Sequence, residues 1–240
     1  MVEHLFGLEP RRPYLTNYSL NVILLFMKKV NEQILEYYRK SGALWEMGSP
    51  TDPHVTTSTS GDHVSAFFNS DIVTARTDNL DFIASAVLLP ELKKRNLNPD
   101  WVFTYAPFGI LVAAASAGRL NARHDFQRHR VKTGYVDPKN EYKTTFGIKP
   151  EEKALVVSDD IYLGGGIKRT IKVLEGMGVE VIPVVYTLAN LSGSSHLDDR
   201  EIIAGAHIDA GRTTADDCGM CANGSEALNA RSNWDLLQSQ

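Results

Sequence analysis

The sequence predicts an α/β protein built around a parallel sheet. Residues 153–186 contain an apolar run, a glycine-rich loop, a helical pattern and a second apolar run, which is the order of a βαβ unit. Residues 101–120 repeat the order of strand, tight loop and helix. The predicted strands are almost continuously apolar, as expected for parallel strands that are covered by helices on both faces. With 240 residues, of which 43% are hydrophobic, the chain can bury one substantial core and should form one domain with embellishments.

Composition limits the location and the partners of the protein. The net charge of -4 argues against a general binder of nucleic acid or of membrane surfaces. The longest apolar run, residues 22–27, is too short to span a bilayer, and the first residues lack the order of a secretory signal. Two cysteines give no disulfide framework, which fits a reducing compartment. We therefore expect a cytoplasmic protein that binds neither nucleic acid nor a membrane.

Local patterns predict the elements of the first half of the chain. A dense apolar centre and a following glycine predict a helix over residues 16–40. Residues 48–60 are rich in Ser, Thr and Pro and indicate a loop or a short hairpin. Asp78 or Asn79 is expected to cap the next helix, whose last turn contains Pro90.

The second half contains two strand-and-helix units and a long connection between them. Residues 101–105 predict a strand and residues 110–120 a helix, whereas residues 123–132 are basic and polar. Residues 134–147 lack a helical period and indicate a long loop or hairpin, a type of segment that often serves as a lid. A further strand or edge segment is expected at residues 202–209, followed by a polar tail.

Residues 154–170 are the stretch around which the sequence is organised. An apolar run delivers Asp159 and Asp160, and three consecutive glycines at 164–166 then lead into a helical pattern at 167–177. A glycine loop at a helix N-terminus offers free backbone N–H groups to an anion. Two acids just upstream can accept hydrogen bonds from sugar hydroxyls. The stretch therefore predicts a sugar-phosphate site.

Two other phosphate-binding motifs fit this stretch less well. A Walker loop ends in Gly-Lys-Ser/Thr, whereas Gly166 is followed by Ile167, so a phosphate-loop nucleotide hydrolase is disfavoured. A dinucleotide fingerprint lacks its third glycine here, although Glu180 on the next strand could mimic the ribose-binding acid. A dinucleotide-binding oxidoreductase remains the third hypothesis.

The stretch from Val156 to Gly166 resembles the phosphoribosyl-diphosphate (PRPP) motif of type I phosphoribosyltransferases, and the resemblance is strongest to orotate phosphoribosyltransferases. It extends over residues 55–225 in the same order. Ser60-Gly61 followed by Phe67-Phe68-Asn69 is similar to the family's substrate segment, and residues 103–113 are similar to its pyrophosphate-loop unit. Three further positions match its basic mobile loop: Arg128, Lys132 and Gly134. The Cys-x-x-Cys before Gly224-Ser225 also resembles the end of some orotate enzymes.

The resemblance implies a type I phosphoribosyltransferase fold, with a small hood built from the N-terminal and C-terminal segments. The implied division is a helix and substrate segment at 1–75, a PRPP-binding core at 76–210 and a tail at 211–240, in a single structural unit. The implied activity joins a nucleobase to ribose 5-phosphate and releases pyrophosphate, with orotate as the first choice of base. PRPP and a nucleobase as substrates, Mg²⁺ as cofactor and a homodimer are implied as well.

The resemblance also assigns roles to individual residues. The implied catalytic residues are Asp159, Asp160, Lys132 and Arg128. The implied loop for the 5-phosphate consists of Leu163, Gly164, Gly165, Gly166 and Ile167. The implied pyrophosphate loop is Ala106, Pro107, Phe108 and Gly109, where family members hold a cis non-proline peptide, and the implied base-binding residues are Phe67 and Phe68.

The chain departs from the family pattern at the phosphate sites. Leu163 and Gly166 stand where the family supplies Thr hydroxyls, and Phe108 stands where a Lys is frequent. The backbone is therefore expected to bind the phosphate. These departures motivate an alternative from another class, a non-catalytic PRPP- or nucleotide-sensing protein of the same fold.

Further departures concern the base. Thr59 replaces a Lys that precedes the Ser-Gly pair in orotate enzymes, and Ala189-Asn190 replaces an Arg that meets the orotate carboxylate. A lost charged partner removes a contact of about 1.5–3 kcal/mol. A purine or another pyrimidine is therefore kept as the alternative base.

Cys218 and Cys221 have the spacing of half a zinc site. The alternatives are a site shared between subunits, a site completed by histidine with His207 nearest in sequence, redox chemistry, or ordinary thiols in a tail. No ligand spacing is visible for the other histidines, including His63, His124, His129 and His196.

Overall fold

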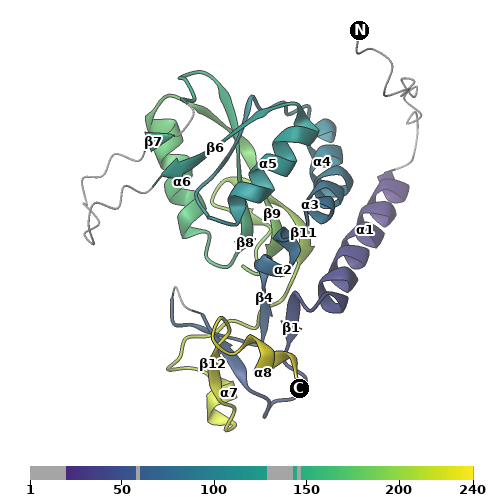
Figure 1. Ribbon diagram of the computed structural model, residues 1–240, viewed down its shortest axis with the longest axis vertical. Coiled ribbons are helices and arrows are strands. Elements are labelled where there is room, and N and C mark those ends of the chain that lie inside the picture. Colours follow the sequence, from purple (N-terminus) through teal and green to yellow (C-terminus); the bar gives the residue numbers. More distant parts are fainter. Residues whose placement is uncertain (1–19, 58–59, 129–142, 145–146, 240) are drawn as a thin grey trace.

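The computed structural model describes residues 20–57, 60–128, 143–144 and 147–239 (Figure 1). Its centre is a seven-stranded sheet in the order β10-β11-β9-β8-β5-β6-β7. The strands are β5 (Trp101–Thr104), β6 (Arg123–Arg128), β7 (Lys143–Thr144), β8 (Lys153–Ile161), β9 (Glu180–Asn190), β10 (His196–Leu197) and β11 (Arg200–His207). Only the two edge strands, β10 and β7, pair antiparallel; the inner pairs are all parallel. The predicted α/β class with a parallel sheet is confirmed.

Helices cover both faces of this sheet, which explains why its strands are apolar at successive positions. Neighbouring residues of β8 contribute to opposite cores: Leu155 and Val157 to one, Ala154 and Val156 to the other. The first core also receives residues of α1 (Leu20–Lys40), α3 (Thr77–Ile83) and α5 (Gly109–Leu120). The second core receives the buried face of α6 (Gly165–Gly176), which lies on the other side of the sheet in Figure 1.

Helix α1 packs against the core through residues four apart. Val30, Ile34 and Tyr38 are buried, as one stripe of an amphipathic helix should be. The Tyr38 hydroxyl donates a hydrogen bond of 3.0 Å to the carbonyl of Leu188 in β9. This helix was predicted to begin at residue 16; residues 16–19 lie outside the described part of the chain.

The helix that follows the substrate segment begins earlier than predicted. Neither Asp78 nor Asn79 caps it, because α3 begins at Thr77 and its N-cap residue is Arg76. The Arg76 guanidinium binds the Asp78 carboxylate at 2.9 Å and so holds it on the outside of the first turn. The helix continues through a wide turn, η1 (Ala84–Leu88), into α4 (Leu89–Lys94). Pro90 lies directly after this wide turn and has no N–H to donate to the preceding turn, which is where a proline disturbs the regular hydrogen-bond pattern of a helix.

A small lobe lies beneath the core in Figure 1 and consists of residues 44–57, 60–68 and 211–239. It contains a two-stranded ladder and a three-stranded sheet in the order β12-β2-β3. Its elements, with the adjoining α2, are β1 (Leu44–Glu46), β2 (His54–Thr56), β3 (His63–Val64), β4 (Ala66–Phe68), α2 (Ser70–Thr74), α7 (Gly219–Ala222), β12 (Ala227–Asn229) and α8 (Trp234–Gln238).

The C-terminal segment, expected to be a polar tail, is folded into this lobe. Strand β12 pairs in parallel with β2, so that Leu228 lies opposite Val55. Leu228, Ala230 and Leu237 are buried in the same core as α1. The segment has too few apolar residues to show a period, and three of them are nevertheless buried in the core.

Strand β6 was also not predicted, because its buried residues are polar. Asp125 and Gln127 are buried, and no apolar alternation marks the strand. It pairs antiparallel with β7. Residues 129–142, which hold most of the predicted long loop or hairpin, lie outside the described part of the chain.

Across the described residues, the longest and most apolar helices still fall short of what crossing a membrane requires.

Candidate active site

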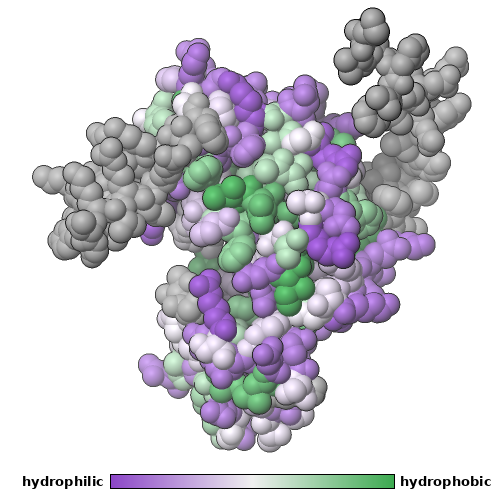
Figure 2. Space-filling view, viewed as in Figure 1, coloured by the Kyte–Doolittle hydropathy of each residue, from purple (hydrophilic) through white to green (hydrophobic). Residues whose placement is uncertain are grey.

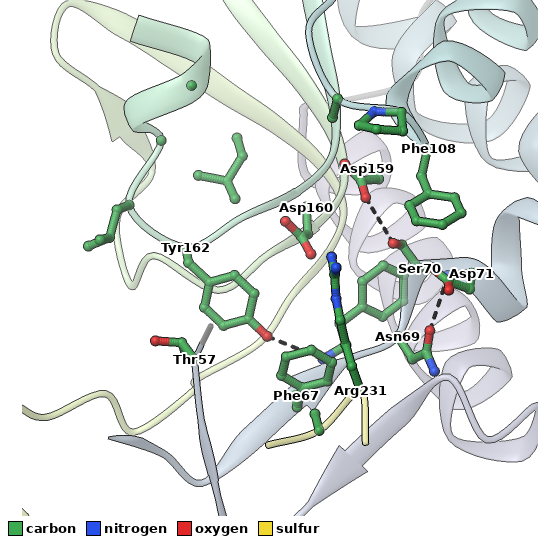
Figure 3. Close-up of a pocket in the computed structure, with 18 of the residues that line it drawn as sticks. Thr57, Phe67, Asn69, Ser70, Asp71, Phe108, Asp159, Asp160, Tyr162 and Arg231 are labelled. Atoms are coloured by element: carbon green, nitrogen blue, oxygen red, sulfur yellow. Dashed lines mark hydrogen bonds between the residues drawn. The ribbon is translucent and has the colours of Figure 1, made fainter. Parts of the chain in front are cut away.

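A pocket of about 680 Å³ opens where the core meets the small lobe (Figure 3). Its core side is formed by the loops that follow β5 and β8, at the carboxyl ends of parallel strands, where ligands of such sheets bind. Its other side is formed by residues 67–71 and by Ala230, Arg231 and Trp234. On the face shown in Figure 2, hydrophobic residues gather toward the middle of the molecule and hydrophilic residues lie around them.

The acid pair lies at the end of β8, and its two members have different surroundings. Asp159 is buried and accepts hydrogen bonds from Ser70 Oγ at 2.8 Å and from Ser158 Oγ at 3.2 Å. Asp160 points into the pocket, toward the guanidinium of Arg231 in Figure 3. Burial, and then the charge of Asp159, raise the pKa of Asp160, and Arg231 opposes the shift. A cation or a hydroxyl donor that reaches this carboxylate would therefore be favoured.

The glycine loop forms an anion site from its backbone. Helix α6 begins at Gly165, and its first N–H bond, from Lys168 to the carbonyl of Gly164, is 2.9 Å long. The N–H groups of Gly165, Gly166 and Ile167 therefore have no intrahelical acceptor and carry the positive end of the helix dipole. Leu163 is 45% exposed beside them and offers no hydroxyl group.

Two of the glycines are required by close contacts. Gly164 has a φ of 68°, and a Cβ atom there would lie 2.3 Å from Leu197 Cδ1. A Cβ atom at Gly166 would lie 2.2 Å from the ring of Tyr105, so this ring rests directly on the loop. No atom lies within 4 Å of a Cβ placed at Gly165.

The predicted pyrophosphate loop forms the neighbouring wall. Ala106, Pro107 and Phe108 line the pocket, and Gly109 is buried behind them at the start of α5. The cis peptide expected here is wrong, because no cis peptide bond occurs in the described residues. The turn closes in another way: the Ala106 N–H donates to Thr104 Oγ1 at 3.4 Å, and Phe108 already has helical angles.

Aromatic rings form the end of the pocket under the small lobe. The Phe67 ring lies 6.1 Å from that of Tyr162 and 5.9 Å from that of Trp234, centre to centre. Phe68 has another position: it is 1% exposed, and its ring packs 4.7 Å from Tyr38 in the core. Phe67 is therefore available to stack on a planar base, whereas the ring of Phe68 supports the wall from behind.

The Tyr162 hydroxyl belongs to the same end of the pocket. It accepts a hydrogen bond of 3.4 Å from the N–H of Phe68. Burial, and then the charge of Asp160, raise the pKa of Tyr162. The hydroxyl is therefore neutral and keeps a proton that it can donate to a ligand.

Several residues of the pocket were not predicted from the sequence, among them Tyr162, Arg231, Trp234 and Ser70. Arg231 and Trp234 belong to the segment taken for a tail, and Ser70 is the first residue of the short helix α2. A tryptophan three residues after an arginine in an otherwise polar segment was a usable signal, because such a segment seldom leaves a large ring in water. Ser70 carried no signal of its own.

The two predicted basic catalytic residues cannot be placed in full. Arg128 ends β6, and β6 runs parallel to β5, so its backbone lies at the sheet edge that bears the pocket. Lys132 lies outside the described residues. Both roles remain predictions.

Two histidines lie beside the two cysteines of the small lobe. Cys218 and Cys221 meet His54 and His63, and one ligand atom from each residue lies within 4.8 Å of the others. The sequence spacing of His63 gave no sign of this position, because the pairing of β2 with β3 brings the residue there. His207 is not in this group; its ring lies 3.2 Å from the Asn190 side chain.

Comparison with known proteins points to one family. No family model matches the chain. The chain is 28% identical over 200 residues to orotate phosphoribosyltransferase of Desulforamulus reducens, an alignment that covers 82% of this chain and 94% of that protein. Two further curated relatives carry the same name, at 24% and 25% identity.

Solved structures agree with the sequence comparison. Orotate phosphoribosyltransferase of Aeropyrum pernix superposes with a TM-score of 0.55 at 19% identity, over 73% of this chain and 93% of that one. Adenine phosphoribosyltransferase of Leishmania donovani gives 0.51 at 16% identity, over 86% and 92%. The chain thus has the type I phosphoribosyltransferase fold and is similar in sequence to orotate phosphoribosyltransferases, which confirms the fold and the resemblance predicted from Asp159, Asp160 and the glycine loop.

Proposed function

We propose that this protein is a phosphoribosyltransferase that transfers the ribose 5-phosphate of PRPP to a nucleobase, with orotate as the base. The observation that carries the proposal is the meeting of three features in one pocket. These are an acid pair, a row of free backbone N–H groups and an aromatic end. The curated relatives named orotate phosphoribosyltransferase support the same reaction.

The glycine loop would bind the 5-phosphate. The N–H groups of Gly165, Gly166 and Ile167 supply donors, and the helix dipole of α6 favours negative charge at that end. Arg169 also lines the pocket and adds a positive charge nearby. Lys168 is less available, because it binds Asp198 at 2.6 Å. The backbone thus takes the part of the missing Thr hydroxyls.

The acid pair would act on the ribose. Its hydroxyl groups donate to the carboxylates of Asp159 and Asp160. As the bond from C1 to the pyrophosphate oxygen breaks, positive charge develops on the sugar ring. A carboxylate that is already in place stabilises this charge without reorganisation. Pyrophosphate leaves with the electrons of the broken bond. A ring nitrogen of the base gives up its proton to solvent and forms the new bond to C1 with the freed electron pair.

Mg²⁺ fits the donor set of this pocket. Asp160 lies beside a second carboxylate, that of Asp159. The pKa of Asp160 is raised, and a nearby cation would reverse this shift. The ion keeps water and substrate oxygens as most of its ligands, so Asp159 and Asp160 would hold it together with the ribose and pyrophosphate oxygens. When bound, it supplies positive charge that balances the leaving pyrophosphate. Arg128 and Lys132 are proposed to do the same.

Arg231 is the proposed partner of the orotate carboxylate. The sequence showed no cation after β9, where Ala189 and Asn190 stand, and the Asn190 side chain is occupied by the carbonyl of Ser194 at 2.7 Å. Arg231 enters the aromatic end from the small lobe instead, and no ion pair engages it among the described residues. A guanidinium beside stacking rings suits a planar base that bears a carboxylate.

Two alternatives to an orotate enzyme lead to different expectations for the pocket. A purine or another pyrimidine as base is supported by the adenine enzyme of the same fold, and it would leave Arg231 without a carboxylate partner. A sensor that binds PRPP without turnover is supported by Leu163, Gly166 and Phe108. A homodimer and a cytoplasmic location are proposed from the resemblance and the composition alone.

One experiment separates these possibilities. Pyrophosphate release is measured with PRPP and Mg²⁺ against orotate, uracil, adenine, hypoxanthine, guanine and xanthine in turn. We expect release with orotate only, and severe loss of turnover in a variant with both Asp159→Asn and Asp160→Asn. Release with a purine alone would replace orotate as the base. Tight PRPP binding by calorimetry without release for any base would favour the sensor over the enzyme.

A further inference from the structure

We propose that His54, His63, Cys218 and Cys221 bind one zinc ion, which joins the two chain segments of the small lobe. Cys218 and Cys221 lie on one turn at α7, and His54 and His63 lie on the adjacent strands β2 and β3. The metal-binding part of this proposal stands independently of the proposed function. Only its effect on the pocket, argued last, depends on that function.

The ligand atoms have the spacing of a tetrahedral site. His54 Nε2 lies 2.9 Å from His63 Nδ1, and Cys218 Sγ lies 3.7 Å from His54 Nε2. Cys221 Sγ lies 3.5 Å from His54 Nε2 and 3.3 Å from His63 Nδ1. Zn–N bonds of about 2.0 Å and Zn–S bonds of about 2.3 Å at tetrahedral angles place nitrogen and sulfur ligands about 3.5 Å apart. All four ligand atoms lie within 4.8 Å of one another, so small movements of these side chains would bring each of them to bonding distance from one zinc ion.

The surroundings of His54 leave the correct nitrogen free for a metal. His54 Nδ1 lies 2.7 Å from Ser225 Oγ, and that hydroxyl donates its own proton to the carbonyl of Asp52 at 2.5 Å. Ser225 Oγ can therefore only accept from the ring, which places the ring proton on Nδ1. The lone pair then lies on Nε2, which faces the other three ligands. Such a hydrogen bond on the remote nitrogen is typical of zinc-bound histidine.

The cysteine turn has the form that a thiolate ligand requires. The N–H of Cys221 points at Cys218 Sγ, 3.4 Å away, and would stabilise negative charge on that sulfur. Gly224 follows with a φ of 84°, a backbone conformation that turns the chain toward Ser225 and β12. The turn therefore holds both sulfurs on one side and delivers Ser225 to His54.

The donor set indicates zinc and a structural role. Two thiolates and two imidazoles in a tetrahedron are the usual ligands of structural zinc. All four positions are filled by protein atoms, so no position remains for a substrate or a water molecule. A lobe with only short strands gains stability from such an ion, because it has little apolar core of its own.

The ion would hold two parts of the pocket together. Thr57 and Ser60, which line the pocket, lie on the connection between His54 and His63. Arg231 and Trp234 follow the two cysteines through β12. Each segment thus has one pair of ligands at its base and pocket residues beyond them. If the proposed function holds, loss of the ion should weaken binding of the base far more than binding of PRPP, whose phosphate loop belongs to the core.

Metal content tests the first part. The full chain is purified without added metal or affinity tag, and zinc is measured by mass spectrometry after extensive dialysis. We expect about one zinc per chain, and at least a tenfold lower content in Cys218→Ser and His63→Gln. His196→Gln, which changes an exposed histidine outside the cluster, should keep its zinc. Chains without zinc, or variants that keep it, would overturn the proposal.

Cobalt substitution keeps the test valid if the variants fail to fold. The wild-type protein is refolded with Co²⁺ in place of zinc. A tetrahedral site with two thiolates should give intense visible bands and thiolate-to-cobalt charge-transfer absorption in the near ultraviolet. The weak bands of octahedral cobalt would contradict the site. The intact mass is also measured under non-reducing conditions. A metal-free chain that is lighter than the reduced chain by two hydrogen atoms would have a disulfide between Cys218 and Cys221, and this result would overturn the proposal as well.

Kinetics test the second part. Zinc is removed by a chelator, and the KM for the base and the Kd for PRPP are compared before and after zinc is restored. We expect at least a tenfold rise in the KM for the base, a change in the Kd for PRPP below twofold, and recovery with zinc. Equal effects on both would reject the link to the base end. A zinc-loaded protein that is inactive with every base would instead reject the proposed function, and the measured metal content would still stand.

Discussion

Ser70 donates a hydrogen bond of 2.8 Å to Asp159 from a position 89 residues earlier in the chain. The bond joins helix α2, next to the small lobe, to the end of the central strand β8. Together with Ser158 it occupies the Asp159 carboxylate, while Asp160 remains directed into the pocket. The two adjacent acids both line the pocket but differ in their support: serine hydroxyls hold Asp159 in place, whereas Asp160 points toward Arg231.

Replacement of Ser70 tests this anchoring bond. A hydrogen bond to a charged group contributes about 1.5–3 kcal/mol, so Ser70→Ala should lower the free energy of unfolding by about that amount and reduce turnover. The matched control is Ser85→Ala, whose hydroxyl donates to the neutral carbonyl of Asp81 at 2.7 Å. Urea denaturation measures both variants. A loss no larger for Ser70→Ala than for Ser85→Ala would contradict the anchoring role.

Replacement of Asp160 should raise the stability of the protein and lower its activity. Its pKa is raised in the folded state, so the free energy of unfolding falls as pH rises from about 4, the usual pKa of Asp, through the folded pKa. Asp160→Asn removes this loss and should be more stable than wild type at pH 7, with the difference vanishing below about pH 4. Turnover should fall by about 10²–10³.

The control for Asp160 is an exposed acid away from the pocket. Asp216→Asn should change neither the stability at pH 7 nor the turnover. Thermal unfolding without ligands, across pH, gives the measurement. An Asp160→Asn protein that is less stable than wild type at pH 7 would show that burial of this carboxylate is offset by contacts with its neighbours.

Arg231 should determine the choice of base. If its guanidinium binds the orotate carboxylate, Arg231→Gln loses about 1.5–3 kcal/mol, or roughly a 10- to 100-fold rise in the KM for orotate. The KM for PRPP should change much less. Steady-state kinetics test this, with Arg76→Gln as the control, since Arg76 is exposed and pairs with Asp78. An unchanged KM for orotate would remove Arg231 from base recognition.

The glycine loop should tolerate a methyl group at one position and reject it at the next. Gly166→Ala would press its Cβ atom against the Tyr105 ring, and overpacking of this kind costs about 1–3 kcal/mol of unfolding free energy. Gly165→Ala meets no atom within 4 Å and should leave stability unchanged or slightly higher. Thermal denaturation of the two variants gives the comparison, and similar melting temperatures would refute the contact.

Glu152 should support the fold above acidic pH. The N–H of Lys149, then the guanidinium of Arg123, lower the pKa of Glu152 to about 2, with Trp101 Nε1 as a further donor. Because the folded pKa is below the unfolded one, the stabilisation is present above about pH 4.5 and is lost as pH falls toward 2. Glu152→Gln should therefore be less stable than wild type at pH 7, with a flatter pH dependence between these values.

The matched control for Glu152 is a glutamate without such donors. Glu226 is exposed and forms no ion pair with any described residue. Glu226→Gln should therefore keep the wild-type pH profile in acid denaturation. Parallel profiles for wild type and Glu152→Gln would show that the three donors do not act together on this carboxylate.

The core of the fold was predictable because its signals are local. The apolar runs of β5, β8 and β9 and the glycines before α6 lie within short windows, and each window determines its own element. Strand β6 was not predicted because its buried residues, Asp125 and Gln127, are polar. The fold of the C-terminal segment was not predicted because β12 forms its hydrogen bonds with β2, which lies far earlier in the chain.

The residues of the site also fall into a part that the sequence identifies and a part that only the fold brings together. Asp159, Asp160 and the glycine loop are contiguous, so the sequence identifies them. Arg231 reaches the pocket only through the pairing of β12 with β2, and the histidine partners of Cys218 are supplied by the same small sheet. Phe67 and Phe68 both line the pocket, but adjacent residues of a strand face opposite sides, and the sequence does not say which of the two rings is the more exposed.

The contact between Tyr105 and Gly166 also has a consequence for ligand length. Tyr105 directly precedes the loop proposed for pyrophosphate, and the glycine belongs to the loop proposed for the 5-phosphate. Their contact fixes how far apart the two anion sites can lie. The pocket should therefore select ligands by the span between their phosphates, so that an analogue with one extra carbon between ribose and phosphate can fill either end but not both.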